Sequence, residues 1–155
     1  QLYFAHKSDF WEADGCNPSM VTDGVAGMLA AARNGEDPKK VTSFTAWAMG
    51  PNAARLASLP PKQAADLVIR EIETVRPATR GQLEFLGLQS WGNDPFAQGG
   101  WAYFRPGQVT SFGASMGAPH GRILFCGEHL GLANRGLEGA MESGTRIAKE
   151  IIASA

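Results

Sequence analysis

The 155-residue sequence predicts an α+β fold, in which a sheet and its helices are followed by a final strand and a C-terminal helix. Two segments show the 3–4 spacing of apolar residues that is typical of a helix with one apolar face. Other segments are short, apolar and rich in aromatic or β-branched residues, as strands are. The composition agrees, because 44% hydrophobic and 19% charged residues are usual in a folded protein and unusual in a disordered tail.

The N-terminal strands are expected first. Residues 2–5 are aromatic and apolar, and Phe10-Trp11 follow after a short polar step, which predicts a strand that runs into a turn at Asp14-Gly15. Residues 25–33 are ambiguous, because their alanines favour a helix whereas their short length favours a strand, which we prefer. Further strands are expected at residues 41–49 and 83–91.

The two predicted helices are defined by their apolar positions. The first follows Pro60-Pro61 and ends at Pro77, with an apolar face formed by Ala64, Leu67, Val68, Ile72 and Val75. The second repeats this spacing near the C-terminus at Leu137, Ala140, Met141, Gly144, Ile147, Ala148, Ile151 and Ile152. Gly139 and Gly144 lie inside it, where each costs about 1 kcal/mol relative to alanine. Such glycines indicate the close approach of another backbone or of a flat ligand.

Charge, hydropathy and metal-ligand spacing exclude several classes of function. The net charge is −1, from 14 Lys+Arg against 15 Asp+Glu, which argues against a nucleic-acid partner. No apolar run approaches the roughly 18 residues of a membrane span. We expect a soluble protein, and the sequence does not indicate whether its compartment is the cytoplasm or the periplasm. Cys16 and Cys126 lack CxxC spacing, and the three histidines lack metal-ligand spacing, so no metal site is expected.

The segment from Gly121 to Ala148 is the most informative part of the chain. A short apolar strand over residues 123–126, with Cys126 as a packed core thiol, ends at Gly127-Glu128. A helix begins near Gly136, and its free N-terminal amides suit an anion or an electron-rich carbonyl. Glu128 could accept a hydrogen bond from a polyol or ribose hydroxyl. The spacing fits equally well a plain strand–loop–helix connection with a solvated Glu128.

Three separated motifs occur in a specific order. SDFW ends at Trp11, WGNDPFAQGGW spans residues 91–101, and Gly127-Glu128 precedes RGLEGAMESG at residues 135–144. The last resembles the C-terminal signature of the flavin-containing amine oxidases, the family of monoamine, polyamine and L-amino-acid oxidases. The second is similar to that family's Trp-x-x-(Asp/Glu)-x-aromatic-x-x-Gly segment beside the flavin. The first looks like its PFW turn.

The resemblance implies a substrate domain with a mixed sheet and helices, and an FAD-binding domain built from discontinuous segments. Residues 1–110 would be the C-terminal half of the substrate-binding domain, and residues 111–155 the C-terminal segment of the FAD-binding domain. It implies FAD contacts at Trp91, Gly127, Glu128, Gly136, Leu137 and Ala140. It also implies that Trp101 and the position of Gly136 line the cage that guides the amine, although Trp101 could instead be a core residue.

Two departures from the family pattern modify these expectations. Gly100 stands where some relatives carry a flavin-bonding cysteine, so FAD should be non-covalent. Gly136 stands where a second cage aromatic is expected, which leaves room for a bulkier amine or for an amino-acid carboxylate. Arg105 and Arg135 are candidates to bind that carboxylate, and Arg105 to Gln108 also suits a plain turn. No catalytic residue is assigned.

The activity implied by the resemblance is hydride transfer from the amine α-carbon to flavin N5, followed by imine hydrolysis and reoxidation by oxygen. The GxGxxG phosphate-binding motif is absent from these 155 residues. Gln1 is not an initiator, and the lysine that many relatives place near the flavin would fall at or before it. We therefore expect a partner in the N-terminal portion of the same enzyme.

Other functions stay open at this point. The chain could be a non-catalytic docking module that needs a partner chain, and it could also form a homo-oligomer. A flavoenzyme of the same fold acting on a carotenoid or porphyrinogen is less favoured, because the segment from Trp91 to Trp101 fits the amine oxidases better.

Overall fold

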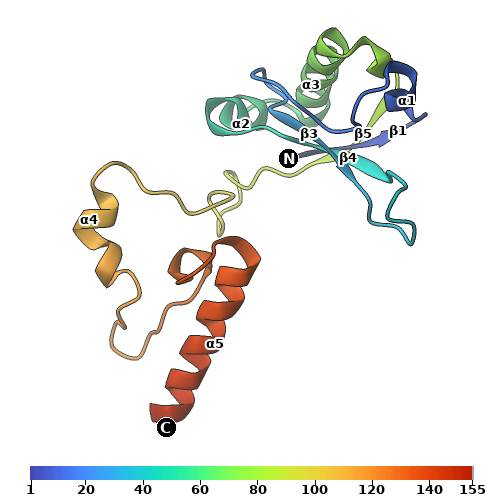
Figure 1. Cartoon of the computed structure of the whole chain (residues 1–155). Helices are drawn as coiled ribbons and strands as arrows, with labels where there is room; N and C mark the ends of the chain where they lie inside the picture. The colour runs from blue at the N-terminus through green and yellow to red at the C-terminus, as the bar shows by residue number, and fades with distance from the viewer. Residues whose placement is uncertain (155) are drawn as a thin grey trace. The chain divides into compact units, whose positions relative to one another are not determined.

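The structure, a computed structural model, describes residues 1–154 and contains two compact units that meet in the sequence between Gln98 and Gly99 (Figure 1). Each unit is described by itself. The assignment of residues 1–110 and 111–155 to two family domains stays a prediction.

The first unit contains a five-stranded sheet in the order β2-β3-β4-β1-β5 (Figure 1). The strands are β1 (Leu2–His6), β2 (Met20–Val21), β3 (Met28–Ala32), β4 (Ser43–Trp47) and β5 (Leu83–Leu88). Their pairings are antiparallel, and Thr45 of β4 lies between Tyr3 of β1 and Ala30 of β3. The structure thus confirms the α+β prediction, including the choice of a strand within residues 25–33.

Helices of the first unit only partly follow the sequence analysis. Helix α3 (Pro61–Val75) is confirmed and is followed by a 3-10 turn, η1 (Pro77–Thr79). Helix α2 (Gly50–Ala57) lies in a segment left unassigned, although Pro51 near its start is a helix-start signal. The strand expected through Phe10-Trp11 is wrong. These residues begin the helix α1 (Phe10–Asp14), because the chain leaves the sheet after β1 and buries the Phe10 side chain. The helix ends at Gly15, which has a left-handed backbone conformation.

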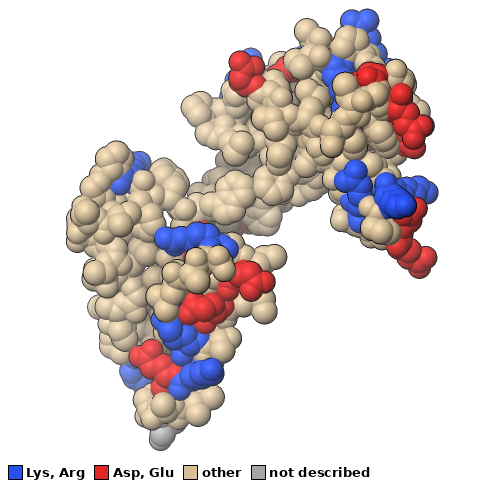
Figure 2. Space-filling view, viewed as in Figure 1, with Lys and Arg blue, Asp and Glu red and all other residues tan. Residues whose placement is uncertain are grey.

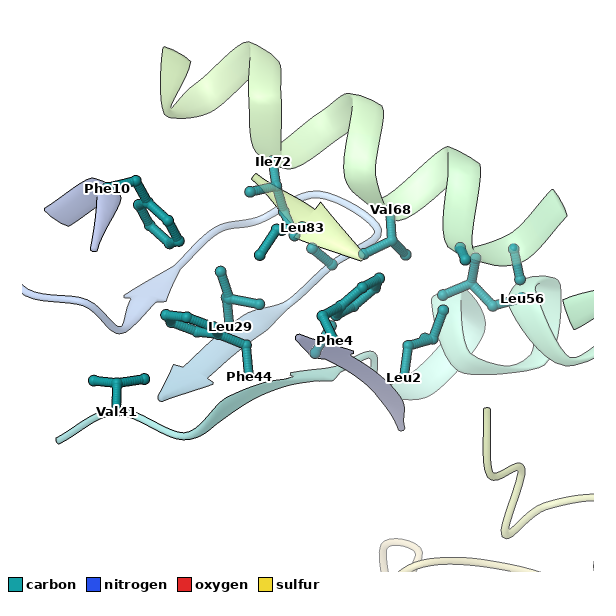
Figure 3. Close-up of a cluster of buried hydrophobic side chains, with 14 residues drawn as sticks. Leu2, Phe4, Phe10, Leu29, Val41, Phe44, Leu56, Val68, Ile72 and Leu83 are labelled. Atoms are coloured by element: carbon teal, nitrogen blue, oxygen red, sulfur yellow. The ribbon is translucent and has the colours of Figure 1, made fainter. Parts of the chain in front are cut away.

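The hydrophobic core of the first unit lies between α3 and one face of the sheet (Figure 3). Val68 and Ile72 of α3 face Phe4 of β1 and Phe44 of β4, and all four side chains are fully buried. Because strand side chains alternate, Tyr3 and Thr45 belong to the opposite face of the sheet, which is only half-buried. One face of the sheet therefore packs against α3, and the opposite face is only partly covered.

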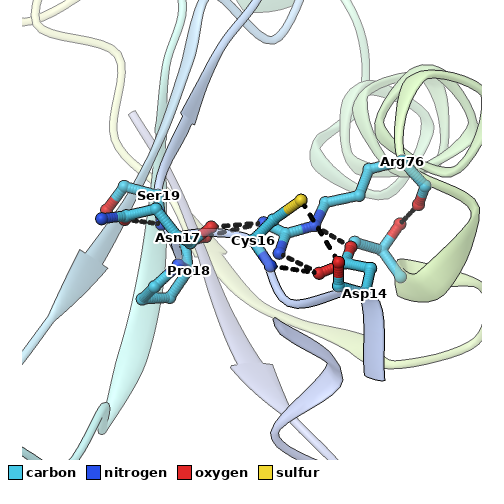
Figure 4. A network of polar contacts seen from close by, with 7 residues as sticks. Asp14, Cys16, Asn17, Pro18, Ser19 and Arg76 are labelled. Carbon is cyan, nitrogen blue, oxygen red and sulfur yellow. Dashed lines mark hydrogen bonds and ion pairs between the residues drawn. The ribbon is translucent and has the colours of Figure 1, made fainter. Parts of the chain in front are cut away.

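A partly buried ion pair between Arg76 and Asp14 lies at the edge of this core (Figure 4). Arg76, directly after α3, donates from Nε to Asp14 Oδ2 at 2.7 Å and from Nη2 to Asp14 Oδ1 at 2.9 Å. Its Nη1 donates to the carbonyl oxygens of Asn17 and Pro18 at 2.8 and 3.2 Å. The guanidinium carbon also lies 5.0 Å from the centre of the Phe10 ring. Arg76 thereby fixes the chain between α1 and β2.

The second unit is built around the C-terminal helix α5 (Gly136–Ser154), which was predicted. Before it come α4 (Gln108–Phe112) and two 3-10 turns, η2 (Gly113–Ser115) and η3 (Glu128–Leu130). The strand expected over residues 123–126 is wrong, because only an isolated bridge pairs His120 with Ile123. The packed core thiol expected at Cys126 is also wrong, since Cys126 is exposed. A strand needs a neighbour to accept its backbone hydrogen bonds, and the described residues of this unit supply none.

Charged side chains of both signs are interspersed over the visible face of each unit (Figure 2). Along α5 they include Glu138, Glu142, Arg146 and Lys149. Across residues 1–154, we find no helix that has both the length and the apolar character needed to cross a bilayer.

Candidate functional site

Helix α5 and the loop before it approach each other closely because two positions carry no side chain. A Cβ added to Gly139 would lie 2.4 Å from the Asn134 carbonyl oxygen and 3.2 Å from that of Glu128. A Cβ added to Gly131 would lie 2.6 Å from the Gly139 Cα. The close approach of another backbone, expected at the helix glycines, is therefore observed at Gly139. At Gly144 an added Cβ would meet nothing within 4 Å.

Ser143 attaches Gly127 to the same helix. The Gly127 amide donates to Ser143 Oγ at 2.9 Å, and this hydroxyl lies within donating distance of the carbonyl oxygens of Gly127 and Ala140, at 2.9 and 3.1 Å. Ser143 is fully buried. Gly127 has φ +151°, a value that favours glycine. The sequence analysis missed Ser143, although it lies on the same helix face as Gly139 and Ile147.

Glu142 and Arg146 hold the next turn of the loop. Glu142 Oε2 accepts from the Leu132 amide at 2.9 Å, and Arg146 Nη2 donates to the Leu130 carbonyl at 2.9 Å. The two side chains also pair with each other, with Nε and Oε1 3.2 Å apart. The hydrogen bond from Leu132, and then that from Arg146, lowers the pKa of Glu142. Their i,i+4 spacing was a signal available in the sequence.

Glu128 connects three parts of the second unit. It lies in η3, and its Oε1 accepts from the Ala102 amide at 3.0 Å, while its Oε2 accepts from the Gly136 amide at 3.2 Å. These two hydrogen bonds, that of Ala102 first, lower the pKa of the carboxyl group. The carboxylate is therefore bound to two backbone amides while it stays accessible to solvent.

The predicted cage residue Trp101 immediately precedes Ala102 and is 59% exposed. A turn follows it, as expected, in which the Gln108 amide donates to the Arg105 carbonyl at 3.0 Å. The guanidinium of the second candidate arginine, Arg135, donates from Nη1 to the His129 carbonyl at 2.6 Å. Arg135 is thus engaged with the loop.

The start of α5 has an open side. Gly136 has φ +72°, and a Cβ added there would meet nothing within 4 Å. Leu137 is 85% exposed, and Ala140 is half-buried one turn further along the helix. The structure therefore brings together Gly127, Glu128, Gly136 and Ala140, all of which the sequence analysis selected. Open backbone beside an exposed apolar side chain fits the edge of a flat aromatic ring.

Trp91, the remaining predicted contact, lies in the first unit and follows β5. Its Nε1 donates to Gln1 Oε1 at 3.3 Å, and Tyr3 Oη donates to the same oxygen at 2.8 Å. The Gln89 amide also donates to the Gln1 carbonyl at 2.9 Å. Gln1 thus orients Trp91, a role that no spacing in the sequence indicates. The indole is 42% exposed.

A family model described as "Flavin containing amine oxidoreductase" matches residues 1–152. The chain belongs to this family. Flavin is the family's cofactor. Within the described residues, no group of three or more His, Cys, Asp or Glu side chains could hold a metal ion.

Individual members of the flavin-containing amine oxidoreductase family cover the chain almost completely. This chain is 24% identical in sequence to an L-amino-acid oxidase of Bothrops moojeni and 26% identical to one of Gloydius halys, and each alignment covers 97% of this chain. Wild-type putrescine oxidase bound to putrescine superposes on 98% of the chain with a TM-score of 0.81 at 20% identity, which shows a shared fold. The chain spans 31% of the length of these two L-amino-acid oxidases and 34% of putrescine oxidase.

Proposed function

We propose that this chain is the C-terminal part of an FAD-dependent oxidoreductase that acts on amines or L-amino acids. The observation that carries the proposal is the family match over residues 1–152. The assembly of Gly127, Glu128, Gly136 and Ala140 around the start of α5 supports it. Residues 1–110 would contribute to the substrate-binding domain and residues 111–155 to the FAD-binding domain. The partner is the N-terminal portion of the same enzyme, which would supply the phosphate-binding motif.

Each site residue has a defined task in this proposal. A bound flavin would supply the acceptor for hydride from the α-carbon of the amine. The amides and dipole at the start of α5, near Leu137, favour negative charge close to them. Trp101 orients the neutral amine, and Gly136 leaves one side of the cage open. Gly100 provides no thiol, so FAD is held without a covalent bond.

An L-amino acid is the preferred substrate class. Two L-amino-acid oxidases match nearly the whole chain. A carboxylate needs a cation, and Arg135 already donates to the His129 carbonyl. Arg105 is therefore the better candidate to bind the substrate carboxylate. A diamine is the alternative class, because putrescine oxidase shares the fold.

The test combines the chain with its N-terminal portion in the full-length protein. Acid precipitation should release FAD into the supernatant, and peroxide should form with L-amino acids and not with diamines. Trp101→Ala should raise KM or lower kcat while FAD content stays intact, and Lys149→Ala at a distant exposed site serves as the control. Absence of flavin would refute the proposal, and unchanged kinetics of Trp101→Ala would remove the cage assignment.

A second candidate function is a non-catalytic docking module. Several large apolar side chains of the second unit are exposed, among them Leu132, Leu137, Met141 and Ile152. Docking would require these side chains to form one contiguous apolar patch, because such a patch marks contact with another chain. Size-exclusion chromatography of residues 1–155 separates the alternatives: a stable complex with a different protein, without flavin, would favour docking.

A further inference from the structure

We infer that Glu128 is a positioning residue that fixes Trp101 relative to the start of α5. Its carboxylate bridges the Ala102 amide and the Gly136 amide, at 3.0 and 3.2 Å. The inference deepens the proposed function, because it matters for turnover only if Trp101 orients the amine.

Glu128 can act in this way because its own backbone is fixed. The preceding Gly127 is bound by the buried Ser143. The carbonyl of Glu128 itself lies against Gly139, at a position where only a glycine fits. Arg146 holds the end of the same turn through the Leu130 carbonyl. The carboxylate therefore extends from a turn anchored on α5, and not from a free loop.

The bridge acts directly on Trp101. The Ala102 amide belongs to the peptide plane that joins it to Trp101, and a peptide plane is rigid. Fixing this N–H therefore restricts the Trp101 Cα, from which the indole projects. The bridge thus sets the distance between the predicted cage wall and the predicted flavin-binding helix.

The side chain needs both the length and the charge of glutamate. Asp would be shorter by one C–C bond, about 1.5 Å, and could not reach both amides. Gln keeps the length, but it offers one acceptor oxygen and turns an NH2 group toward the other N–H. A carboxylate has about four acceptor positions, so Glu128 could also accept from a flavin hydroxyl. The experiment must therefore separate the bridge from cofactor binding.

The test compares Glu128→Gln and Glu128→Asp with Glu142→Gln in the full-length protein. Glu142 is the matched control, because it binds an amide of the same loop but does not contact Ala102. In flavin-free protein, hydrogen exchange of the Ala102 amide should accelerate about tenfold in both Glu128 variants and stay unchanged in the control. In the loaded enzyme, KM should rise or kcat should fall while FAD content is retained.

A double-substitution cycle adds a readout that a merely structural role would not move. If Glu128 acts through Trp101, Glu128→Gln should have no further kinetic effect in the Trp101→Ala background. Unchanged exchange at Ala102, or additive effects of the two substitutions, would overturn the inference. Loss of FAD with unchanged exchange would instead assign Glu128 to cofactor binding. If the unsubstituted protein binds no flavin, the proposed function fails, whereas the exchange experiment still decides whether the bridge exists.

Discussion

Gly139 and Gly144 both lie inside α5, but alanine should have opposite effects at the two positions. In a helix interior, alanine is about 1 kcal/mol more favourable than glycine. At Gly144 the new Cβ meets nothing within 4 Å, so Gly144→Ala should raise the free energy of unfolding of residues 1–155 by about 1 kcal/mol.

At Gly139 the clash of the new Cβ with the loop outweighs the stability gained from the helix propensity of alanine. The Cβ would lie 2.4 Å from the Asn134 carbonyl oxygen and 3.2 Å from that of Glu128. Both are backbone atoms, so the loop itself must move, and such overpacking costs about 2–3 kcal/mol. Gly139→Ala should therefore lower the free energy of unfolding by about 1–2 kcal/mol.

Urea unfolding followed by circular dichroism measures both variants, and hydrogen exchange of residues 127–132 reports on the loop. Exchange should accelerate only in Gly139→Ala, because only there is the loop displaced. If both substitutions change stability in the same direction, the close approach of loop and helix is not the reason for glycine at position 139.

Two further predictions concern the other anchors. Ser143→Ala removes the acceptor of the Gly127 amide and should cost about 1–2 kcal/mol in urea unfolding, whereas Ser154→Ala, at the exposed end of the same helix, should cost less than about 0.5 kcal/mol; equal losses would contradict the role of Ser143. The hydrogen bond from Arg76 lowers the pKa of Asp14 from 3.8 to about 2. The stability from this pair should therefore be complete above pH 3.8 and be lost as the pH falls toward 2; Arg76→Met should flatten this pH dependence in acid titrations, and an unchanged profile would refute it.

The parts of the fold that sequence patterns predict are those determined by local periodicity. Helices α3 and α5 are long enough for the spacing of their apolar residues to be unmistakable. The five residues of α1 are too short to show a period, and aromatic Phe10-Trp11 resembled a strand. The apolar run over residues 123–126 was misassigned for a different reason. Its composition suits a strand, but composition does not reveal whether a neighbouring strand is present to pair with it.

For the candidate site too, sequence patterns predicted the residues that are close together in the chain and missed the long-range contacts. Gly127, Glu128 and Gly136 were found from motifs, because they are close in sequence. The amide partner of Glu128 at Ala102 lies 26 residues away, and Gln1 lies 90 residues from Trp91. Neither pairing has a spacing that could be recognised. Such long-range polar contacts depend on the tertiary fold, so only coordinates reveal them.

The strand order has a consequence for how the first unit folds. Of the five strands, β1 comes first in the chain, yet it lies between β4 and β5, with Leu2 opposite both Ala46 and Leu88. The pairing of β3 with β4 needs only a short loop to close, and it should form early. β1 must wait until residue 88 has been synthesised before its edge toward β5 is paired. Until then its backbone amides stay open to other chains, so folding of this unit should be slow and sensitive to protein concentration.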